Sequence, residues 1–314
     1  MLRDLVKGED AQITAAFTVL RALDADIILL TDLDYDHGLI ALNTFADQLA
    51  QAGLPYATRF ALAPNTGIAT GFDLDGNGRL GEARDAVGYG RFAGDGGMAI
   101  LSRYPVQHDT VQDMSAFLWR DLPGALLPPD MPPDVALIQR LSTTGHWAVP
   151  FAVGDATLTM LAFHATPPVF DGPEDRNGRR NHDEAAFWLH YLAGEVPYPA
   201  PTGSFVITGD ANLDPTDGEG TPAALNALLA HPMLQDPAPQ GTSGRTDTGR
   251  GDAALDTALF DPPLGGLRLD YILPSADLTI TAAGVLWPPA NDPLSAALTA
   301  ASRHRPVWVD ITLP

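Results

Sequence analysis

Acidic and histidine residues recur where the predicted strands of this chain end. Loops at strand ends carry many binding and catalytic side chains of α/β scaffolds. Carboxylate oxygens, an Asn carbonyl and water suit Mg²⁺ or Mn²⁺, and a nearby His can act as general acid or base. Taken singly, each residue also fits a turn former, a helix cap or a structural side chain, so the weight lies in the ordered set. The set comprises Asp32, Asp34, Asp36, His164, Asp210, Asn212, Asp214, Asp270, Arg303 and His304.

The elements that must position these residues follow from hydrophobic periodicity and turn signals. Apolar residues at helical spacing predict helices over 10–23 and 38–52, and a short β-branched run predicts a buried strand over 26–31. Gly154-Asp155 indicates a tight hairpin, and Asn181 is expected to cap a helix with Glu184 closing a capping box. The other predicted helices are 181–192 and 221–229, and the other predicted strands are 98–102, 135–141, 147–153, 156–163, 204–208, 267–273, 278–286 and 306–313.

Three segments rich in Gly, Pro and Asp show no regular pattern. They cover residues 64–96, 107–134 and 235–266. Loops of this length in a compact domain are usually functional or stabilised by metal. None of them is typical of a linker between independent cores. The alternation of helices and buried strands therefore predicts a single α/β domain over residues 1–314 with long ordered loops.

Composition narrows the class of protein. The 314 residues include 18 Lys and Arg against 39 Asp and Glu, a net charge of −21. This charge disfavours bulk nucleic-acid binding, no apolar run is long enough to span a membrane, and the lack of Cys excludes disulfides and thiolate chemistry. We recognise no signal peptide at residues 1–4, although an acidic, Cys-free chain fits an extracellular or periplasmic protein. The oligomeric state stays open.

Five short motifs follow one another along the chain. They are Gly96-Gly97-Met98-Ala99-Ile100-Leu101-Ser102-Arg103-Tyr104-Pro105, Phe163-His164-Ala165, Gly209-Asp210-Ala211-Asn212, Leu269-Asp270-Tyr271-Ile272 and Ser302-Arg303-His304-Arg305-Pro306-Val307. In this order they resemble the endonuclease/exonuclease/phosphatase superfamily, which has a deoxyribonuclease I-like fold. The resemblance implies an α/β (α+β) fold, a two-layer β-sandwich flanked by helices. Because the chain begins in the first helix, we expect the first strand of the family to be missing.

The resemblance assigns roles to five of these residues. It implies that Asp210 binds the attacking water and acts as base or metal partner, and that Asn212 touches the phosphate or the metal. It further implies that Asp270 orients His164, and that His164 and His304 face the scissile phosphate. The reaction implied is attack of water on a phosphate ester with Mg²⁺ or Mn²⁺ as cofactor.

Two positions depart from the family pattern. Asp32 stands where the family has its metal-binding Glu, and its side chain is one methylene shorter, so Asp34 or Asp36 could take over the metal. Arg303 replaces the Asp that precedes the last His of the pattern, and a guanidinium cannot ligate a metal but can bind phosphate through two hydrogen bonds. The candidate metal ligands are Asp32, Asp34, Asp36, Asp210 and Asn212.

A second acidic group lies in the first long loop. Residues 73–78 match the first six positions of an EF-hand calcium loop, but the twelfth position, normally Glu, is Arg84. An Asx-rich turn network without metal fits the same spacing, so both interpretations stay open, and a bound Ca²⁺ would be structural. The candidate calcium ligands are Asp73, Asp75, Asn77, Arg79, Glu82 and Asp85.

The most basic stretch of the chain is 171–182, directly after His164. Arg176, Arg179 and Arg180 could face an anionic substrate from this stretch, although a solvated charged loop explains them equally well. His146, at the start of a predicted strand, is a further candidate for substrate binding, and a structural role is the alternative.

Two functions from different classes fit these observations. The first is a metal-dependent phosphoesterase, either a phosphatase or a phosphodiesterase, that hydrolyses a small phosphorylated substrate. The alternative is a catalytically silent protein of the same fold that binds phosphate or a lipid head group, or a nuclease. The fold itself does not choose among substrates.

Overall fold

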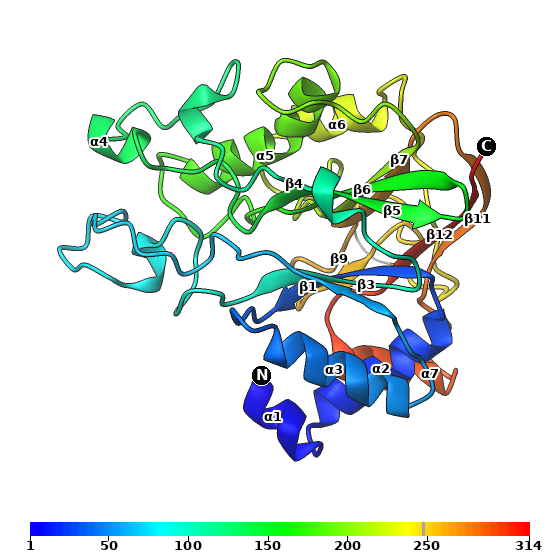
Figure 1. Ribbon diagram of the computed structural model, residues 1–314. Coiled ribbons are helices and arrows are strands. Elements are labelled where there is room, and N and C mark those ends of the chain that lie inside the picture. Colours follow the sequence, from blue (N-terminus) through cyan, green and yellow to red (C-terminus); the bar gives the residue numbers. More distant parts are fainter. Residues whose placement is uncertain (247–248) are drawn as a thin grey trace.

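Two β-sheets pack face to face in the computed structural model, which describes residues 1–246 and 249–314 (Figure 1). The smaller sheet has three antiparallel strands in the order β1-β3-β2. These strands are β1 (Ile27–Leu33), β2 (Thr58–Phe60) and β3 (Gly97–Ser102). Opposite it, the larger sheet runs in the order β10-β7-β6-β5-β4. Its strands are β4 (Gln112–Asp113), β5 (His146–Val153), β6 (Ala156–His164), β7 (Phe205–Asp210) and β10 (Asp270–Pro274).

The direction of the strands in the larger sheet decides where the polar strand ends meet. β6 and β7 are parallel, whereas β10 is antiparallel to β7 and β5 is antiparallel to β6. The ends of β6 and β7 therefore lie at the same edge of the sheet as the starts of β5 and β10. That edge carries the candidate site.

Apolar side chains fill the space between the sheets. Phe60 and Ile100 of the smaller sheet pack with Trp147, Phe151 and Met160 of the larger one, all of them buried. Removing a large apolar side chain from water contributes about 1.5–3 kcal/mol, so this layer holds the two sheets at a fixed separation.

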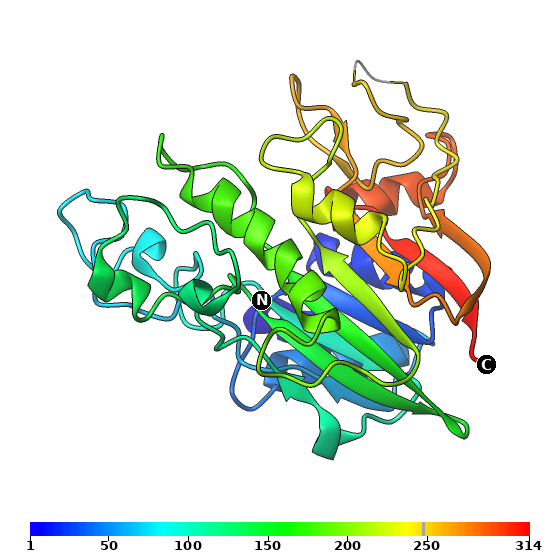
Figure 2. The same cartoon turned by 90° about the horizontal axis from the view of Figure 1, so that it is seen from above.

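Helices cover both outer faces (Figures 1 and 2). The smaller sheet packs against a cluster that includes Leu5, Phe45 and Leu49, and the larger sheet packs against Phe187 and Trp188. The first group of helices is α1 (Leu2–Lys7), α2 (Ala11–Leu23) and α3 (Ile40–Gln51), and the second is α5 (Arg176–Leu192) and α6 (Ala223–Leu229). The predicted two-layer sandwich flanked by helices is confirmed.

The remaining elements are short or peripheral. α7 (Leu294–Ala301) packs on α2, where Gln12 Nε2 donates to the Ala301 carbonyl at 2.9 Å. The other elements are α4 (Pro133–Ala136), β8 (Ala258–Leu259), β9 (Gly266–Leu267), β11 (Thr279–Val285), β12 (Val307–Thr312) and the 3₁₀ turns Ala83–Asp85, His108–Thr110 and Trp119–Asp121. The three long segments carry only such short elements, and residues 247–248 of the third lie outside the described residues. None of the described helices is long and apolar enough to cross a membrane.

Three local predictions are wrong. The expected strand 135–141 starts instead with the short helix α4, because Pro133 at the first helical turn favours a helix. The expected strand 267–273 is divided into β9 and β10. Asn181 does not cap α5, which begins five residues earlier at Arg176. Both Asn181 and Glu184 are buried inside that helix, where their side chains bond to neighbouring loops rather than to the end of the helix.

Candidate active site

Three neighbouring strands of the larger sheet place polar side chains in a row. β6 ends at His164 and β7 ends at Asp210, and these residues lie opposite each other in the parallel register. β10 begins at Asp270, opposite Asp210 in the antiparallel register. Residues that lie opposite each other on adjacent strands share a face of the sheet. The pairing of the strands therefore brings His164, Asp210 and Asp270 together.

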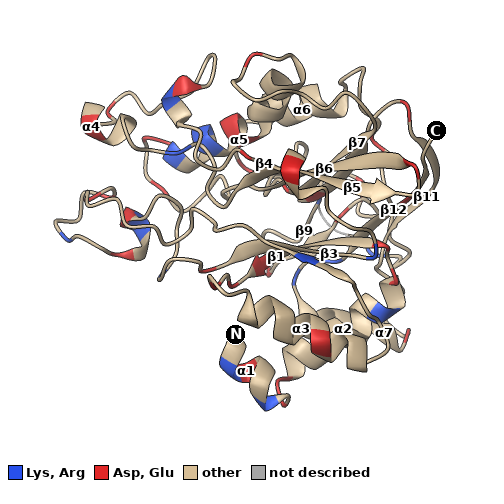
Figure 3. Cartoon of the chain, in the orientation of Figure 1, with Lys and Arg blue, Asp and Glu red and all other residues tan. Residues whose placement is uncertain are grey.

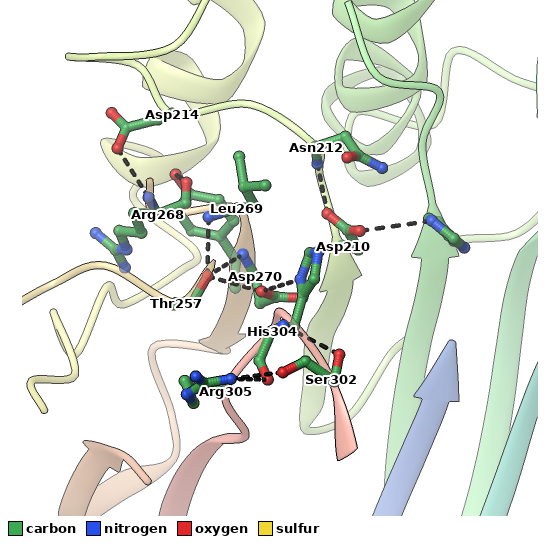
Figure 4. A network of polar contacts seen from close by, with 12 residues as sticks. Asp210, Asn212, Asp214, Thr257, Arg268, Leu269, Asp270, Ser302, His304 and Arg305 are labelled. Carbon is green, nitrogen blue, oxygen red and sulfur yellow. Dashed lines mark hydrogen bonds and ion pairs between the residues drawn. The ribbon is translucent and has the colours of Figure 1, made fainter. Parts of the chain in front are cut away.

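His304 joins this row from the turn between α7 and β12. Its Nδ1 lies 2.8 Å from Asp270 Oδ2 (Figure 4). Burial disfavours the charged imidazole, but the Asp270 carboxylate outweighs burial and raises the pKa of His304 to about 9. His304 is therefore an imidazolium at neutral pH. The expectation that Asp270 orients His164 is wrong, because the Asp270 carboxylate hydrogen-bonds His304 instead.

Thr257 holds the Asp270 side chain in place. Its hydroxyl donates to Asp270 Oδ2 at 2.7 Å and accepts from the backbone N–H groups of Leu269 and Asp270 (Figure 4). Thr257 is fully buried. No sequence pattern points to it, because it lies in the patternless segment 235–266 and its role arises only when that segment folds beside β10.

Asp210 is buried, and its Oδ2 lies 3.5 Å from His164 Nε2. Its Oδ1 accepts from the backbone N–H of Asn212 at 2.7 Å (Figure 4). Burial, reinforced by the neighbouring charge of Asp270, raises the pKa of the Asp210 carboxyl, and burial lowers the pKa of His164. The edge thus combines a histidine whose pKa is lowered, His164, with a histidine and a carboxyl group whose pKa values are raised, His304 and Asp210.

A divalent cation fits the oxygen-rich side of this edge. Ligand atoms of Asp210, Asp270 and His304 all lie within 4.8 Å of one another. Asp32 at the end of β1 is exposed, and its charge raises the pKa values of His164, Asp210 and His304. Carboxylate oxygens are the ligands that Mg²⁺ and Mn²⁺ prefer. Among the described residues, Asp210 and Asp270 bring carboxylate oxygens close enough together for one cation, and metal binding by Asp32 stays a prediction.

Gly96 makes room for the Asp32 carboxylate. It has a φ of 59°, and a Cβ added to it would lie 2.5 Å from Asp32 Oδ1. Both the left-handed backbone and the close approach favour glycine at this position. The close approach of Asp32, a candidate metal ligand, thus explains why the motif begins with glycine at position 96.

Asp34 and Asp36, the other two carboxylates of the acidic run after β1, have partners of their own. Asp36 caps the start of α3, where its carboxylate accepts from the N–H groups of Gly38, Ile40 and Ala41. Burial would raise its pKa, but these donors outweigh burial and lower it. Asp34 accepts weakly from Gly96 N at 3.4 Å and lines a small cavity of about 10 Å³ on the α3 side. The prediction that Asp36 takes over the metal is wrong, because its carboxylate caps α3. Asp34 Oδ2 lies 3.4 Å from the Met1 amino nitrogen, and metal binding by Asp34 stays a prediction.

Helix α5 ties the site-bearing loops together. Asn181 Nδ2 donates to the carbonyls of Thr166 and Ala211, each at 2.7 Å. Asn212 Nδ2 donates to the Ala165 carbonyl at 2.9 Å. The loops after His164 and after Asp210 are therefore held together by amide side chains. No residue within 1–246 or 249–314 donates a hydrogen bond to Asn212 Oδ1.

Two predicted substrate-binding residues are structural. Arg180 is buried and donates to the backbone carbonyls of residues 140–142. His146 is fully buried, with Nδ1 2.6 Å from Ser142 Oγ and Nε2 3.0 Å from the Glu184 carbonyl. Burial lowers the pKa of His146 to about 4. The predictions that Arg180 and His146 contact substrate are wrong, because both side chains are buried and hydrogen-bonded to other parts of the protein.

Two further arginines keep their predicted exposure. Arg303 is exposed beside His304, and its backbone carbonyl accepts from Leu259 N at 3.1 Å. Arg179 is partly exposed and donates from Nε to the Glu174 carbonyl. Contact of either with substrate stays a prediction.

The first long loop brings three of its candidate calcium ligands together. Ligand oxygens of Asp73, Asp75 and Asp85 lie within 4.8 Å of one another. The side chains of Asn77 and Arg79 point their nitrogens at Glu82, at 2.6 and 3.4 Å. The Arg79 guanidinium is therefore a counter-ion of Glu82, whereas the seventh position of an EF-hand loop binds through its backbone carbonyl. Calcium binding at this loop, by Arg79 as by the other candidates, stays a prediction.

The fold places acidic and histidine residues together at one edge of a β-sandwich. The sequence pattern of the Endonuclease/Exonuclease/phosphatase family matches residues 5–304. The chain belongs to this family, whose members generally hydrolyse phosphate esters with divalent metals. A search of curated proteins gave no match.

Solved structures share the fold at low sequence identity. A family protein from Beutenbergia cavernae is 16% identical with a TM-score of 0.57, covering 97% of this chain and 66% of its own, so this chain spans just under two thirds of that protein. The human Nocturnin catalytic domain with bound sulfate is 13% identical with a TM-score of 0.53, covering 97% and 87%. A family protein from Bacteroides vulgatus is 15% identical with a TM-score of 0.51, covering 97% and 91%. These likenesses support the fold alone.

Proposed function

We propose that this protein is a metal-dependent phosphoesterase that hydrolyses a small phosphorylated substrate. The observation that carries the proposal is the buried Asp210, which lies 3.5 Å from His164 and opposite the Asp270–His304 pair. Burial and the Asp270 charge disfavour the charged form of Asp210 more than the nearby His304 favours it, and a bound cation would offset that cost. A site that needs a cation and presents an imidazolium suits an anionic ester.

The chain's own residues divide the chemical work. Asp210 accepts the proton of the attacking water, because its Oδ1 is taken by Asn212 N–H while its Oδ2 faces His164 Nε2 at 3.5 Å. His304 Nδ1 is taken by Asp270, so Nε2 is the atom that can donate to a phosphoryl oxygen and stabilise the developing charge. Mg²⁺ or Mn²⁺ held by Asp32 and Asp210, with Asn212 Oδ1 beside them, would supply further positive charge when bound.

A small substrate fits the charge of the chain better than a nucleic acid does. Acidic residues outnumber basic ones by 39 to 18, and in the view of Figure 3 the acidic positions are spread over many helices and loops. A surface of this sign repels a polyanion at long range. A compact ester with one or two phosphates avoids most of that repulsion.

The experiment is a hydrolysis assay with p-nitrophenyl phosphate and bis-p-nitrophenyl phosphate in Mg²⁺ or Mn²⁺. We expect turnover that stops with EDTA and in His304→Ala, whereas Asp10→Asn, which changes the cap of α2 outside the site, leaves it unchanged. Turnover that survives both treatments would contradict the proposal. Phosphate binding without turnover would instead support a silent binding protein.

A further inference from the structure

Four arginines gather where α5 begins and along the segment that faces it. They are Arg140, Arg176, Arg179 and Arg180, and Figure 3 shows the basic positions of α5 near its start. Within the described part of the chain, no carboxylate lies at ion-pair distance from any of the four. Other arginines of this acid-rich chain do pair, for example Arg59 with Asp47, Arg103 with Asp26, and Arg268 with Asp236.

Two of the four arginines keep donors to spare. Arg180 gives three hydrogen bonds to backbone carbonyls. In contrast, Arg140 Nη1 donates to Asn65 Oδ1 at 2.7 Å, and Arg176 Nη2 donates to Gln139 Oε1 at 2.8 Å. Both acceptors are neutral amides, and a guanidinium has five N–H donors. Arg140 and Arg176 are therefore positioned but not neutralised.

Arg176 shows the cost of this arrangement most clearly. Its Nε is buried and has no hydrogen-bond partner among the described residues. Burial lowers the pKa of Arg176, while Glu174, Asp171 and Asp85 act on it only from beyond ion-pair distance. A buried cationic donor without an acceptor destabilises the protein, and a bound anion would remove that penalty.

The arginines lie on the same edge of the sheet as His164. Asn65, the partner of Arg140, donates to the Ser142 carbonyl and from its backbone to the Thr144 carbonyl. Residues 140–144 lead into β5, whose first residue lies opposite Phe163, the neighbour of His164. Glu184 also accepts from the N–H groups of Thr143 and Thr166, which joins this segment to the loop after His164.

We propose that Arg140 and Arg176 form a second anion subsite, which binds a distant phosphate of the substrate while another phosphate is hydrolysed beside His304. The proposal rests on the phosphoesterase function and narrows its substrate class to small molecules with two phosphate groups. Guanidinium groups bind phosphate oxygens through paired, charge-assisted hydrogen bonds. Two guanidinium groups fixed on the same edge of the sheet as the site would select for the distance between the two phosphates.

Binding of inorganic pyrophosphate, measured by calorimetry, tests the subsite without turnover. We expect Arg140→Met and Arg176→Met each to weaken binding about tenfold, the loss of a charge-assisted contact. Arg21→Met, on the exposed side of α2, is the matched control and leaves binding unchanged. Because Arg140 also holds Asn65, Arg140→Lys keeps the charge and is expected to lose less. Unchanged affinity in both Met variants, or no binding to the wild type, would overturn the proposal.

Turnover of a matched pair of esters connects the subsite to the substrate. With fructose 1-phosphate and fructose 1,6-bisphosphate, we expect Arg176→Met to raise KM for the bisphosphate about tenfold and to leave kcat on the monophosphate unchanged. Equal losses on both esters would contradict the proposal. If neither ester is hydrolysed but Arg176→Met still weakens pyrophosphate binding, the phosphoesterase function fails and the anion subsite stands.

Discussion

The protein has two acidic groups that look alike in sequence and differ in structure. Asp210 and Asp270 at the sheet edge, and Asp73, Asp75 and Asp85 in the first long loop, each bring ligand atoms within 4.8 Å of one another. Asp73 accepts from the N–H groups of residues 77 and 78, and Asp85 from those of residues 74 and 82. The carboxylates of Asp73 and Asp85 thus already accept hydrogen bonds from backbone N–H groups of their own loop.

The pKa values of Asp73 and Asp210 are shifted in opposite directions. Hydrogen bonds from the backbone, above all from Gly78, lower the pKa of the partly exposed Asp73. Burial and the charge of Asp270 raise the pKa of Asp210, whose Oδ1 accepts one backbone bond from Asn212. A bound cation adds little stabilisation to a carboxylate that already accepts several hydrogen bonds. It stabilises the charged form much more when the carboxylate is buried and accepts few. Spare lone pairs, rather than the number of acidic residues, therefore distinguish the two groups.

The largest expected effect is on turnover at the sheet edge. Asp210→Asn and His304→Ala should each lower kcat about 10²- to 10⁴-fold, because each removes a group that handles a proton or charge in the transition state. Steady-state kinetics with a phosphate ester measures this. Asp73→Asn is the matched control and should leave kcat unchanged. An equal loss of kcat in Asp73→Asn would contradict the claim that only the sheet-edge group takes part in turnover.

A smaller effect is expected at Thr257, which positions Asp270 without touching substrate. Thr257→Val keeps the shape but removes the hydroxyl that donates to Asp270 Oδ2, so we expect kcat to fall about 10- to 100-fold through misplacement of His304. Thr257→Ser restores the hydroxyl and should rescue most of the rate. If Ser is as slow as Val, the hydroxyl is not what positions Asp270.

Glu184 offers a third kind of carboxylate, buried but satisfied by Thr143 N and Thr166 N. Burial raises its pKa to about 7, above the unfolded value, so the stability it contributes is complete below pH 4.5 and is lost as pH rises through 7. A pKa that differs by one between the folded and unfolded states changes the free energy of unfolding by about 1.4 kcal/mol. Denaturant unfolding should show the wild type losing stability relative to Glu184→Gln between pH 5 and 8, and parallel curves would contradict the raised pKa.

The smallest effect is expected from Ca²⁺ at the loop. If Ca²⁺ binds, the gain is small because hydrogen bonds already order the carboxylates, and millimolar Ca²⁺ should raise Tm by about 2 °C or less. Differential scanning calorimetry of Asp73→Ala with Asp75→Ala should show no such rise, with turnover largely intact. A rise that persists in the double variant would place the ion elsewhere.

Much of the fold could be predicted from the sequence because local patterns agree with it. The apolar run at 26–31 and the Gly154-Asp155 turn mark β1 and the β5–β6 hairpin, which the structure confirms. The strand-end positions of His164 and Asp210 followed from the same pattern. Contacts between distant segments could not be predicted, because nothing local to Thr257 or Asn181 records which loop it will meet.

The same limit explains the mistaken site residues. In the sequence alone, Asp36 is a possible substitute for Asp32 as a metal ligand, yet α3 begins just after Asp36 and its backbone N–H groups bind the Asp36 carboxylate. Arg180 looked exposed in a polar stretch, but α5 starts early enough to bury it. In each case the position of a helix boundary, which sequence patterns define poorly, decided the role of the side chain.

The most direct test of a metal-dependent site at the sheet edge is a titration of metal-free protein with Mn²⁺ while hydrolysis of p-nitrophenyl phosphate is followed. We predict that the wild type and the Asp73→Asn, Asp75→Asn double variant regain turnover as Mn²⁺ binds. Asp32→Asn and Asp210→Asn should neither bind Mn²⁺ tightly nor regain turnover. Full hydrolysis by the metal-free wild type, or loss of turnover only in the loop variant, would contradict a metal-dependent site at this edge.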